Sequence, residues 1–378
     1  MSIPQLFICP ISLDLFKDPV TLCTGQTYDR SSIEKWVAAG NLTCPVTMQK
    51  LHDLSMVPNH TLRHLIHDWL QPQLGIHRLS INDSLASLKH QLQSHDSTLH
   101  DKYETLQRTR ALSEESTSRI LCLVHSGFFP LLLELLFQEI APQISQESIE
   151  FAEQSLCCAL KLLPFAEHKS LNILRQESKL ESFKILLEFG TSKIKVGLCH
   201  LIEAISSSLD TRELCLMLGR NRGLLRILVQ LVEDKFGGGI NAISALCSLE
   251  TNREIMVEEG VVNGLVSYIC NGEDLAGSAM ATIEVLLGVE SGKEAVIEDG
   301  NGIRGIVKMV FRVSDHQSSE SAVRSLIILC SHSLQAREEA ICAGVLTQLL
   351  LLLQSQCSCT TKSKARLLLQ LLRSNCNQ

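Results

Sequence analysis

Residues 253–265 read REIMVEEGVVNGL, and the pattern in this stretch decides the fold of most of the 378-residue chain. A charged pair, Arg253 and Glu254, lies seven and six residues before Gly260, and the apolar Val257 lies three residues before it. The same arrangement recurs before Gly219, Gly300 and Gly344, with Leu216, Ile297 and Ile341 in the place of Val257. Recurrence at intervals of about 40 residues predicts a repeat protein.

Each repeat combines helical segments with a glycine turn. A leucine-rich segment follows the glycine, as at 224–232 and 345–353, and another helical segment with small residues precedes the charged pair. These small residues are Ala242, Ala245, Ala279, Ala281 and Ala322. Glycine suits a sharp turn at the end of a helix. Because one such unit cannot bury its apolar face alone, the units must stack.

The repeat unit resembles an armadillo repeat, and roughly five or six units of this length fit across residues 80–378. The resemblance implies an α-solenoid, and a generic helical bundle with chance spacing is the alternative. The run Gly237–Gly239 departs from the pattern and is interpreted as a loosened turn between helices. Residues 76–118 are polar with a narrow leucine stripe, so we expect a helical connector that begins the solenoid before the repeat domain at 119–378.

The first 75 residues have a different character, because proline and glycine interrupt short apolar runs between residues 4 and 30. A helix is predicted from Ser31, which forms a capping box with Glu34. A second helix is predicted after Asn59, with apolar residues up to Trp69 at three- and four-residue spacing. The residues assigned to the core are Val20, Tyr28, Ile33 and Leu65.

The motifs of this region follow a specific order. They run Cys9-Pro10-Ile11-Ser12, Asp18-Pro19-Val20, Gly25-Gln26-Thr27-Tyr28-Asp29-Arg30, Ile33, Trp36, Cys44-Pro45-Val46-Thr47 and Pro58-Asn59. The series resembles the U-box family over the whole length of that domain. The resemblance implies a small RING-like α+β domain at 1–75. Joined to armadillo repeats, it is typical of plants, and the whole chain is expected to be mostly α.

Metal binding must be considered for a RING-like domain, and Cys9, Cys23 and Cys44 with nearby histidines are the available ligands. A zinc cross-brace needs ligands largely in closely spaced pairs, four for each ion. Ser12 and Thr47 stand where the second cysteine of two such pairs would be. We therefore predict a zinc-free domain with no cofactor, and a zinc-binding RING domain is the alternative.

Without a metal, polar side chains must hold the loops in place. The resemblance implies a polar network, and the loop side chains available for it are Ser12, Asp14, Lys17, Asp18, Asp29, Arg30 and Thr47. A buried donor without a partner costs about 1–3 kcal/mol, which is a large share of the stability of so small a domain.

The resemblance also implies a docking surface. U-box proteins are ubiquitin ligases that bind a ubiquitin-conjugating enzyme on a groove between two loops and the central helix. By position, Ile11 and Leu13 would lie on the first loop, Trp36 on the helix and Pro45 on the second loop; the alternative is that Ile11, Leu13 and Trp36 belong to the core. In related domains a polar or basic residue after the second-loop threonine helps to orient ubiquitin. Here that residue is Met48, which puts the efficiency of transfer in doubt.

Composition and charge exclude several classes of function. A net charge of −7 and the lack of a long basic run argue against nucleic-acid binding. No apolar run reaches about 18 residues and the N-terminus lacks a signal-peptide pattern, so we expect no transmembrane segment. We expect a cytoplasmic protein that can also enter the nucleus. In such a reducing compartment the cysteines are small core residues.

The predicted function is a RING-type ubiquitin ligase that forms no covalent ubiquitin intermediate. No cysteine has the basic partner or helix N-terminus that would activate it as a nucleophile. The U-box would bind the charged conjugating enzyme and the solenoid would bind a protein substrate, so that proximity promotes ubiquitin transfer to a lysine. The alternative is a non-catalytic armadillo scaffold whose U-box only docks partners.

Overall fold

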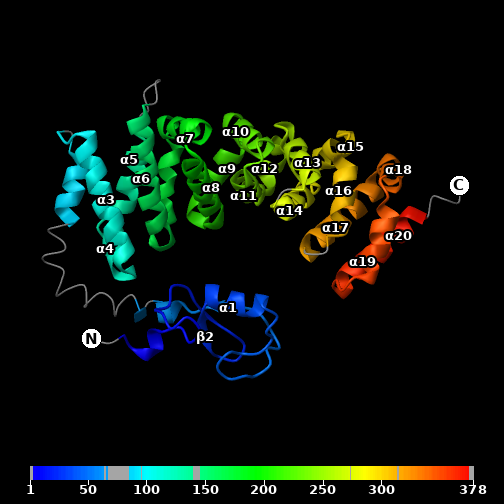
Figure 1. Cartoon of the computed structure of the whole chain (residues 1–378), viewed down its shortest axis with the longest axis horizontal. Coiled ribbons are helices and arrows are strands. Elements are labelled where there is room, and N and C mark those ends of the chain that lie inside the picture. The colour runs from blue at the N-terminus through cyan, green and yellow to red at the C-terminus, as the bar shows by residue number, and fades with distance from the viewer. Residues whose placement is uncertain are drawn as a thin grey trace. The chain divides into compact units, whose positions relative to one another are not determined.

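The computed structural model describes residues 3–63, 65–66, 85–94, 96–138, 145–272, 274–312 and 315–373. The chain divides into two compact units, Met1–Gln93 and Ser94–Gln378 (Figure 1). The division falls inside the segment 76–118, which the sequence predicts to be a connector. Each unit is described by itself below.

The N-terminal unit contains a small antiparallel sheet and the helix α1, and its described residues are also helical at 60–63, 65–66 and 85–93. Its strands are β1 (Pro19–Thr21), β2 (Thr27–Asp29) and β3 (Val57–Pro58), in the order β2-β1-β3. A 3-10 helix, η1 (Gln5–Phe7), precedes the sheet, and α1 (Arg30–Ala38) follows β2 directly. Val20 in the central strand lies opposite Tyr28 and Pro58 in the two neighbouring strands. The sheet therefore joins distant parts of this short segment.

Three of the four residues that the sequence assigns to the core of the N-terminal unit are buried. Val20, Tyr28 and Ile33 are fully buried. The sequence pattern also assigns Leu65 to the core, and this prediction is wrong, because Leu65 is 49% exposed and its neighbour Ile66 is buried. One residue corresponds to a rotation of about 100° around a helix, so a small error in phase exchanges the two faces. Trp69, on the same predicted segment, lies outside the described residues.

The start of α1 differs from the prediction. Asp29 is the residue before the helix, and Ser31 does not form a capping box with Glu34. Instead, the Ser31 hydroxyl donates a 2.9 Å hydrogen bond to Oδ1 of Asp29. The Asp29 carboxylate already accepts hydrogen bonds from the backbone N–H groups of the residues just before β1. The Ser31 hydroxyl is a further donor to the same carboxylate.

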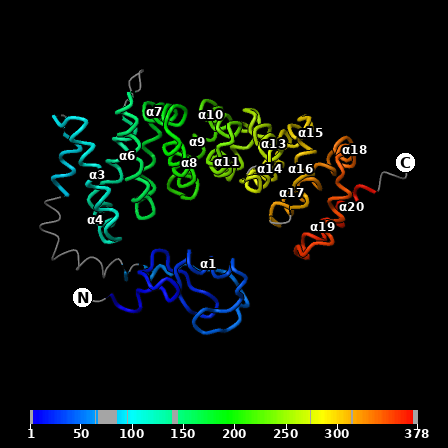
Figure 2. Tube along the Cα trace, viewed as in Figure 1, coloured from blue at the N-terminus to red at the C-terminus, as the bar shows by residue number. Residues whose placement is uncertain are grey.

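The second unit is a row of three-helix repeats (Figures 1 and 2). A helix, α3 (Leu99–Glu115), precedes the first repeat, and two short 3-10 turns, η2 (Leu163–Phe165) and η4 (Leu209–Thr211), join helices. The repeats are α4 (Thr117–His125), α5 (Phe128–Leu136) and α6 (Gln146–Leu162); η3 (His168–Arg175), α7 (Glu177–Phe189) and α8 (Ser192–Ser207); α9 (Arg212–Gly219), α10 (Arg222–Glu233) and α11 (Gly237–Cys247); α12 (Glu250–Glu258), α13 (Val261–Asn271) and α14 (Ala276–Leu286); α15 (Glu290–Glu298), α16 (Gly302–Met309) and α17 (His316–His332); α18 (Leu334–Cys342), α19 (Val345–Gln354) and α20 (Cys359–Arg373). The predicted α-solenoid is confirmed.

The third helices of successive repeats pack against one another. Contacts run from α6 to α8 and onward through α11, α14 and α17 to α20. The small residues Ala242, Ala279 and Ala322 are fully buried in these helices. The interpretation of Gly237–Gly239 as a loosened turn is wrong, because these glycines form the first turn of α11. A Cβ atom on Gly237 would lie 2.7 Å from Cδ1 of Leu275, which is the flexible end of that side chain.

The glycines between first and second helices do not all have the same role. Gly260 and Gly344 have φ values of 83° and 85°, and Gly127 has 75°, so glycine itself makes the turn at these places. Gly219 is instead the last residue of α9, and its φ is not left-handed. A Cβ atom there would lie 2.1 Å from Nδ2 of Asn252 in the next repeat. At Gly219 the missing side chain makes room for a neighbour.

The arginine of the repeated charged pair has a structural role. Arg253 donates through Nε to the carbonyl oxygen of Cys247 at a distance of 3.1 Å. Arg337 makes the corresponding bond to the carbonyl oxygen of Cys330. Both carbonyls lie at or near the end of a third helix, where backbone acceptors lack partners within the helix. The arginine therefore fixes the junction between two repeats.

Among the described residues, no single helix is both long and apolar enough to cross a membrane. The pair α4 and α5 reaches that length and composition together, with a bend of 75° between the two helices.

Candidate functional site

Two loops of the N-terminal unit have the same hydrogen-bonded conformation. The first loop, residues 8–15, is closed by a bridge between Ile8 and Leu15, and the second loop, residues 43–50, by a bridge between Thr43 and Lys50. In the first loop the backbone N–H of Cys9 donates to the carbonyl oxygen of Asp14 (2.8 Å), and the N–H of Leu13 donates to that of Cys9 (2.9 Å). In the second loop the N–H of Cys44 donates to the carbonyl oxygen of Gln49 (2.8 Å), and the N–H of Met48 donates to that of Cys44 (2.9 Å). Both Leu13 and Met48 have a φ of 59°.

The predicted docking residues lie on these loops and on α1. Leu13, at the first loop, is 76% exposed, and Ile11 is half-buried. Pro45, at the second loop, is half-buried as well. Trp36 is also half-buried, and its Nε1 donates a 2.9 Å hydrogen bond to the carbonyl oxygen of Thr43. The helix that carries Trp36 is thus tied to the start of the second loop.

The second loop also exposes two apolar side chains, those of Val46 (51%) and Met48 (70%). The sequence interpretation gave Val46 no role. The signal that would have found it is the parallel with the first loop, because Val46 follows Cys44 by the same spacing as Ile11 follows Cys9.

Asp29 holds residues 17–18, the segment that leads from the first loop into the sheet. Its carboxylate is buried, and Oδ2 accepts hydrogen bonds from the backbone N–H groups of Lys17 (2.7 Å) and Asp18 (3.0 Å). Burial acts to raise the pKa of Asp29, but the N–H groups of Asp18 and Lys17 and the hydroxyl of Ser31 outweigh it, so the pKa is lowered. The ionised form is therefore the one that fits the site.

Asp18 joins two separate arginines. Its Oδ2 lies 2.6 Å from Nε of Arg30 and its Oδ1 lies 2.7 Å from an Nη atom of Arg63. Arg63 comes after β3, and no spacing in the sequence indicates that it reaches Asp18. These groups are a third or more exposed, so the pairs contribute little stability individually, about 0–1 kcal/mol. They join the segment before β1 to the start of α1 and to the helical residues that follow β3.

The sulfur atoms of Cys9 and Cys44 are buried hydrogen-bond acceptors. The backbone N–H of Asp29 donates to the Cys9 sulfur at 3.2 Å, and the Thr24 hydroxyl donates to the Cys44 sulfur at 3.4 Å. The Tyr28 hydroxyl lies 2.9 Å from the Cys44 sulfur. Burial alone would raise the pKa of Cys44, but hydroxyl groups beside its sulfur lower it to about 6. Since both cysteines are fully buried, neither sulfur is accessible to a macromolecular substrate.

The remaining predicted loop residues differ in what they do. The Ser12 hydroxyl lies beside the Cys9 sulfur and, against the effect of burial, helps to lower the pKa of that thiol. The Thr47 hydroxyl is buried without a hydrogen bond of good geometry, although its closeness to Cys44 helps to lower the pKa of that thiol. Asp14 is exposed, and within the described residues its backbone carbonyl, not its carboxylate, makes the bond that closes the loop. No group of three or more potential metal ligands comes together in the described residues.

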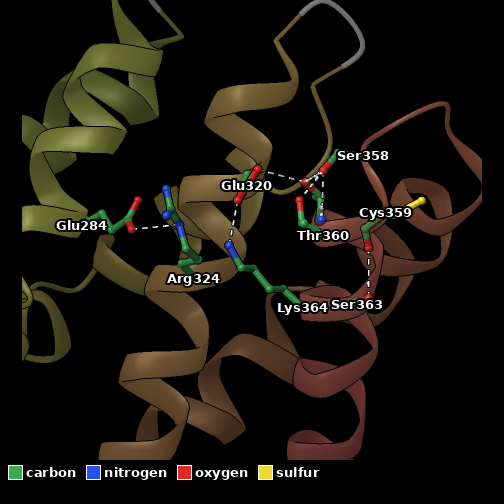
Figure 3. Close-up of polar contacts among 9 residues, drawn as sticks. Glu284, Glu320, Arg324, Ser358, Cys359, Thr360, Ser363 and Lys364 are labelled. Atoms are coloured by element: carbon green, nitrogen blue, oxygen red, sulfur yellow. Dashed lines mark hydrogen bonds and ion pairs between the residues drawn. The ribbon is translucent and has the colours of Figure 1, made fainter. Parts of the chain in front are cut away.

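Charged side chains cross the seams between third helices of the solenoid. Figure 3 shows Glu284 of α14 paired with Arg324 of α17 (2.9 Å), and Glu320 of α17 paired with Lys364 of α20 (2.7 Å). Glu320 also accepts a hydrogen bond from the Thr361 hydroxyl at 3.1 Å. Hydrogen bonds from Lys364 and Thr361 outweigh burial and lower the pKa of Glu320. These four charged side chains alternate in sign along α14, α17 and α20, the third helices of the last three repeats.

A similar set of contacts around one glutamate lies at the opposite end of the solenoid. Glu153 of α6 accepts hydrogen bonds from the Thr191 hydroxyl (2.7 Å) and from Nζ of Lys193 (3.0 Å), both at the start of α8. A glutamate that meets one threonine and one lysine of the next third helix thus occurs at both ends.

Two family models together match nearly the whole chain. The model described as U-box domain matches residues 3–74, and the model described as plant U-box protein ARM repeat region matches residues 80–378. The chain belongs to the plant U-box proteins with armadillo repeats. U-box domain-containing proteins 26 and 25 of Arabidopsis thaliana are 32% and 33% identical to it, over 99% of this chain and 92% of each relative.

Other relatives of this plant U-box protein carry a named activity. The E3 ubiquitin-protein ligase PUB23 of Arabidopsis thaliana is 27% identical over 98% of this chain and 93% of its own length. A solved structure described as "A conserved phosphorylation switch controls the interaction between cadherin and beta-catenin in vitro and in vivo" matches 76% of this chain and 52% of its own, with a TM-score of 0.59 and 14% identity. The latter likeness concerns the fold alone.

Proposed function

We propose that this plant U-box protein is a RING-type ubiquitin ligase, which binds a ubiquitin-charged conjugating enzyme through its U-box and a protein substrate through its solenoid. Membership of the U-box family and the named ligase activity of relatives support the role. The proposal names ubiquitin, a conjugating enzyme and a substrate protein as partners.

The observation that carries the proposal is the pair of matched loops with apolar side chains at their tips. Ile11 and Leu13 on the first loop, Trp36 on α1 and Pro45 on the second loop are the residues proposed to contact the conjugating enzyme. All four are at least partly exposed, and the Trp36 to Thr43 hydrogen bond holds helix and second loop together. A small apolar patch of this kind suits a weak contact that must exchange after each transfer.

The proposed mechanism uses proximity and not covalent catalysis. The two cysteines nearest the docking residues, Cys9 and Cys44, are fully buried, which supports a mechanism without a ubiquitin thioester on this domain. The ligase would hold the thioester between ubiquitin and the conjugating enzyme near a substrate lysine and restrict its motion, so that the lysine amine attacks the thioester carbonyl. The thiol of the conjugating enzyme leaves as an isopeptide bond forms.

Met48 occupies the position that in related domains helps to orient ubiquitin. A thioether has no N–H or O–H group and is only a weak acceptor. We therefore propose that ubiquitin is held less firmly at this corner than in domains with a polar or basic residue there, so transfer after docking is slower.

We propose that the solenoid supplies substrate recognition along its stacked third helices, where a polar ladder such as Glu284, Arg324 and Glu320 can meet a protein chain. The proposed location is the cytoplasm, with access to the nucleus. Imaging of a fluorescently tagged chain would test the location, and exclusive retention at a membrane would contradict it.

The test of the proposed function is autoubiquitination by the purified full-length chain with an activating enzyme, ubiquitin, ATP and a panel of conjugating enzymes. The expected result is ubiquitin chains with at least one conjugating enzyme. A folded chain that yields no product with any of them would contradict the proposal. If such a chain still bound conjugating enzymes, the non-catalytic scaffold would be the correct function.

A further inference from the structure

The second helices of two repeats, α13 and α19, correspond residue by residue. Each begins directly after a glycine with a left-handed φ, which is Gly260 for α13 and Gly344 for α19. Counting from these glycines, the two helices bury the same inner face, which consists of Val261, Leu265 and Tyr268 in α13 and of Val345, Leu349 and Leu352 in α19. The other faces of the two helices can therefore be compared.

A second face of α13 is covered by the next repeat. It consists of Val262, Val266 and Ile269, all of which are buried. A Cβ atom on Gly305 of α16 would lie 3.2 Å from Cδ1 of Ile269, so the second helix of the next repeat packs against this face. Burial of such faces between neighbouring repeats stabilises a solenoid.

The corresponding face of α19 is a leucine stripe, which consists of Leu346, Leu350 and Leu353. Leu346 is 39% exposed, Leu350 is 54% exposed and Leu353 is half-buried. Their spacing places them on one side of the helix. α19 lies near the C-terminal end of the row of repeats, where it contacts α16, α18 and α20 (Figure 1). The outer face at the end of a stack is ordinarily polar, so an exposed apolar stripe here indicates a partner.

The third helix beside α19 has a charged side. α20 repeats the burial pattern of α17, since the shared buried places hold Ser318, Ala322, Ser325 and Leu329 in α17 and Thr361, Ala365, Leu368 and Leu372 in α20. α17 also buries a second set of residues, which are Ser319, Val323, Leu326 and Cys330. In α20 these places hold residues that are not buried, namely Lys362, Arg366, Leu369 and Arg373.

The leucine stripe and the charged residues of α20 face the same way. On both helices they directly follow the residues of the buried face, as Leu346 follows Val345 and Arg366 follows Ala365. A short connection makes α19 and α20 antiparallel neighbours, and the two helices contact each other. In an antiparallel pair with a shared core, residues that follow the buried ones lie on the same side. The two helices therefore present one surface.

The basic side of α20, formed by Lys362, Arg366 and Arg373, has no acidic partner within the described residues. Residues 340–378 contain no aspartate or glutamate, although the whole chain has a net charge of −7. Lys364 lies elsewhere on α20 and is paired with Glu320. The leucine stripe is thus accompanied by positive charge that the described part of the solenoid does not neutralise.

We propose that the leucine stripe and the basic side of α20 dock a partner protein through an acidic amphipathic helix. This surface is separate from the U-box, and the inference goes beyond the proposed function. The docked segment is helical because the same face of α13 receives a helix, α16, and leucines at three- and four-residue spacing interlock with such a stripe. It is acidic because the charges of α20 are all positive. A second copy of the chain would bring like charges together, which is unfavourable.

The experiment measures the affinity of the full-length chain for labelled synthetic peptides by fluorescence anisotropy. The probe is a peptide of about 18 residues, long enough to form a helix, with leucines along one side and glutamates on the others. One comparison peptide has the same composition with its leucines spread around the helix, and another has lysine in place of glutamate. We expect the probe to bind about tenfold or more tightly than either. No binding of the probe, or equal affinity for all three, would overturn the proposal.

Variants of the chain locate the binding surface. The double variant Leu346→Glu/Leu350→Glu removes the apolar contact, so the affinity for the probe should fall about tenfold or more. Arg366→Glu/Arg373→Glu should also weaken binding and reduce its dependence on salt, because exposed charge pairs are screened.

The matched control is Leu209→Glu in η4, where the leucine is 85% exposed, and it should bind as the wild type does. All substituted residues are exposed, and far-ultraviolet circular dichroism checks that each variant is folded. Wild-type affinity in both double variants would overturn the proposal.

Two further measurements test other occupants of the surface. Sedimentation of the full-length chain over a range of concentrations reports self-association, and flotation with vesicles of phosphatidylcholine and phosphatidylserine reports membrane binding. We expect neither to depend on the leucine stripe. A dimer that Leu346→Glu/Leu350→Glu dissociates would assign the surface to a second copy, and vesicle binding that this variant abolishes would assign it to an anionic membrane. Either result would overturn the proposal.

Discussion

Nε1 of Trp36 donates a hydrogen bond of 2.9 Å to the carbonyl oxygen of Thr43, and so links the central helix of the U-box to its second loop. Trp36→Phe keeps an aromatic ring and removes this donor. A hydrogen bond of this kind contributes about 0.5–1.5 kcal/mol, so we expect the affinity for the conjugating enzyme to fall about three- to tenfold.

Calorimetric titration of Trp36→Phe against the wild type makes this measurement. The control is Trp36→Ala, which should bind more weakly still because it also loses the ring. Wild-type affinity in Trp36→Phe would mean that the link to Thr43 does not position the second loop.

Loss of the apolar contacts on the two loops should abolish ubiquitin transfer. Ile11→Ala and Pro45→Ala each remove a partly exposed side chain, so the fold should survive while docking fails. The measurements are autoubiquitination and far-ultraviolet circular dichroism. Cys23→Ser, at an exposed position between β1 and β2, is a control that should retain activity. Full activity in both alanine variants, with wild-type spectra, would refute the docking assignment.

Asp29→Asn should destabilise the U-box selectively. The carboxylate binds the N–H groups of Lys17 and Asp18, and a neutral amide leaves at least one of them poorly matched, at a cost of about 2–3 kcal/mol. Both tryptophans of the chain, Trp36 and Trp69, belong to this domain, so tryptophan fluorescence during urea unfolding reports on it and not on the solenoid. An unchanged unfolding midpoint would contradict the role of Asp29.

The effect of Asp29 depends on pH. Its pKa is lowered in the folded state, so its contribution to stability is fully present above the unfolded value of about 4 and is lost as the pH falls through the folded value. The difference in unfolding free energy between wild type and Asp29→Asn should therefore be constant near neutral pH and narrow below about pH 4. A difference that widens in acid would show that another group dominates.

Gly219→Ala should destabilise the solenoid by roughly 1–3 kcal/mol, because the added Cβ atom would overlap the buried amide of Asn252. Thermal unfolding followed by far-ultraviolet circular dichroism measures the loss, since the solenoid supplies most of the helix. In an Asn252→Ala background the same substitution should cost less, because the obstructing amide is gone. Equal costs in both backgrounds would show that the overlap is not the cause.

The sequence predicted the architecture because repeated spacing and helical periodicity are local signals. The predictions were wrong where packing between elements determines which residue is buried or why a glycine is needed. Leu65 and Ile66 are equally apolar neighbours, and only packing determines which is buried. Gly219 has the same place in its repeat as Gly260, yet it is retained for contact with Asn252 in the next repeat and not for its own backbone.

The site was predictable in its residue types but not in its pairings. Asp18, Asp29 and Arg30 could be named as polar loop residues, but Arg63 and Thr24 reach their partners from distant positions that no spacing reveals. Val46 was missed although Cys9-Pro10-Ile11-Ser12 and Cys44-Pro45-Val46-Thr47 match in residue type, because only the hydrogen bonds show that the two loops also share one backbone conformation.

The self-contained closure of each loop has a consequence for how this domain can change over time. Each loop is shaped by its own bridge and its own pair of backbone bonds. A shared metal would make the two loops depend on one another, so that a change in one disturbs both. Here the tip residues of one loop can be exchanged while the other keeps its form. With the proposed docking role of the loop tips, preference among conjugating enzymes would change by single substitutions that each leave a folded domain.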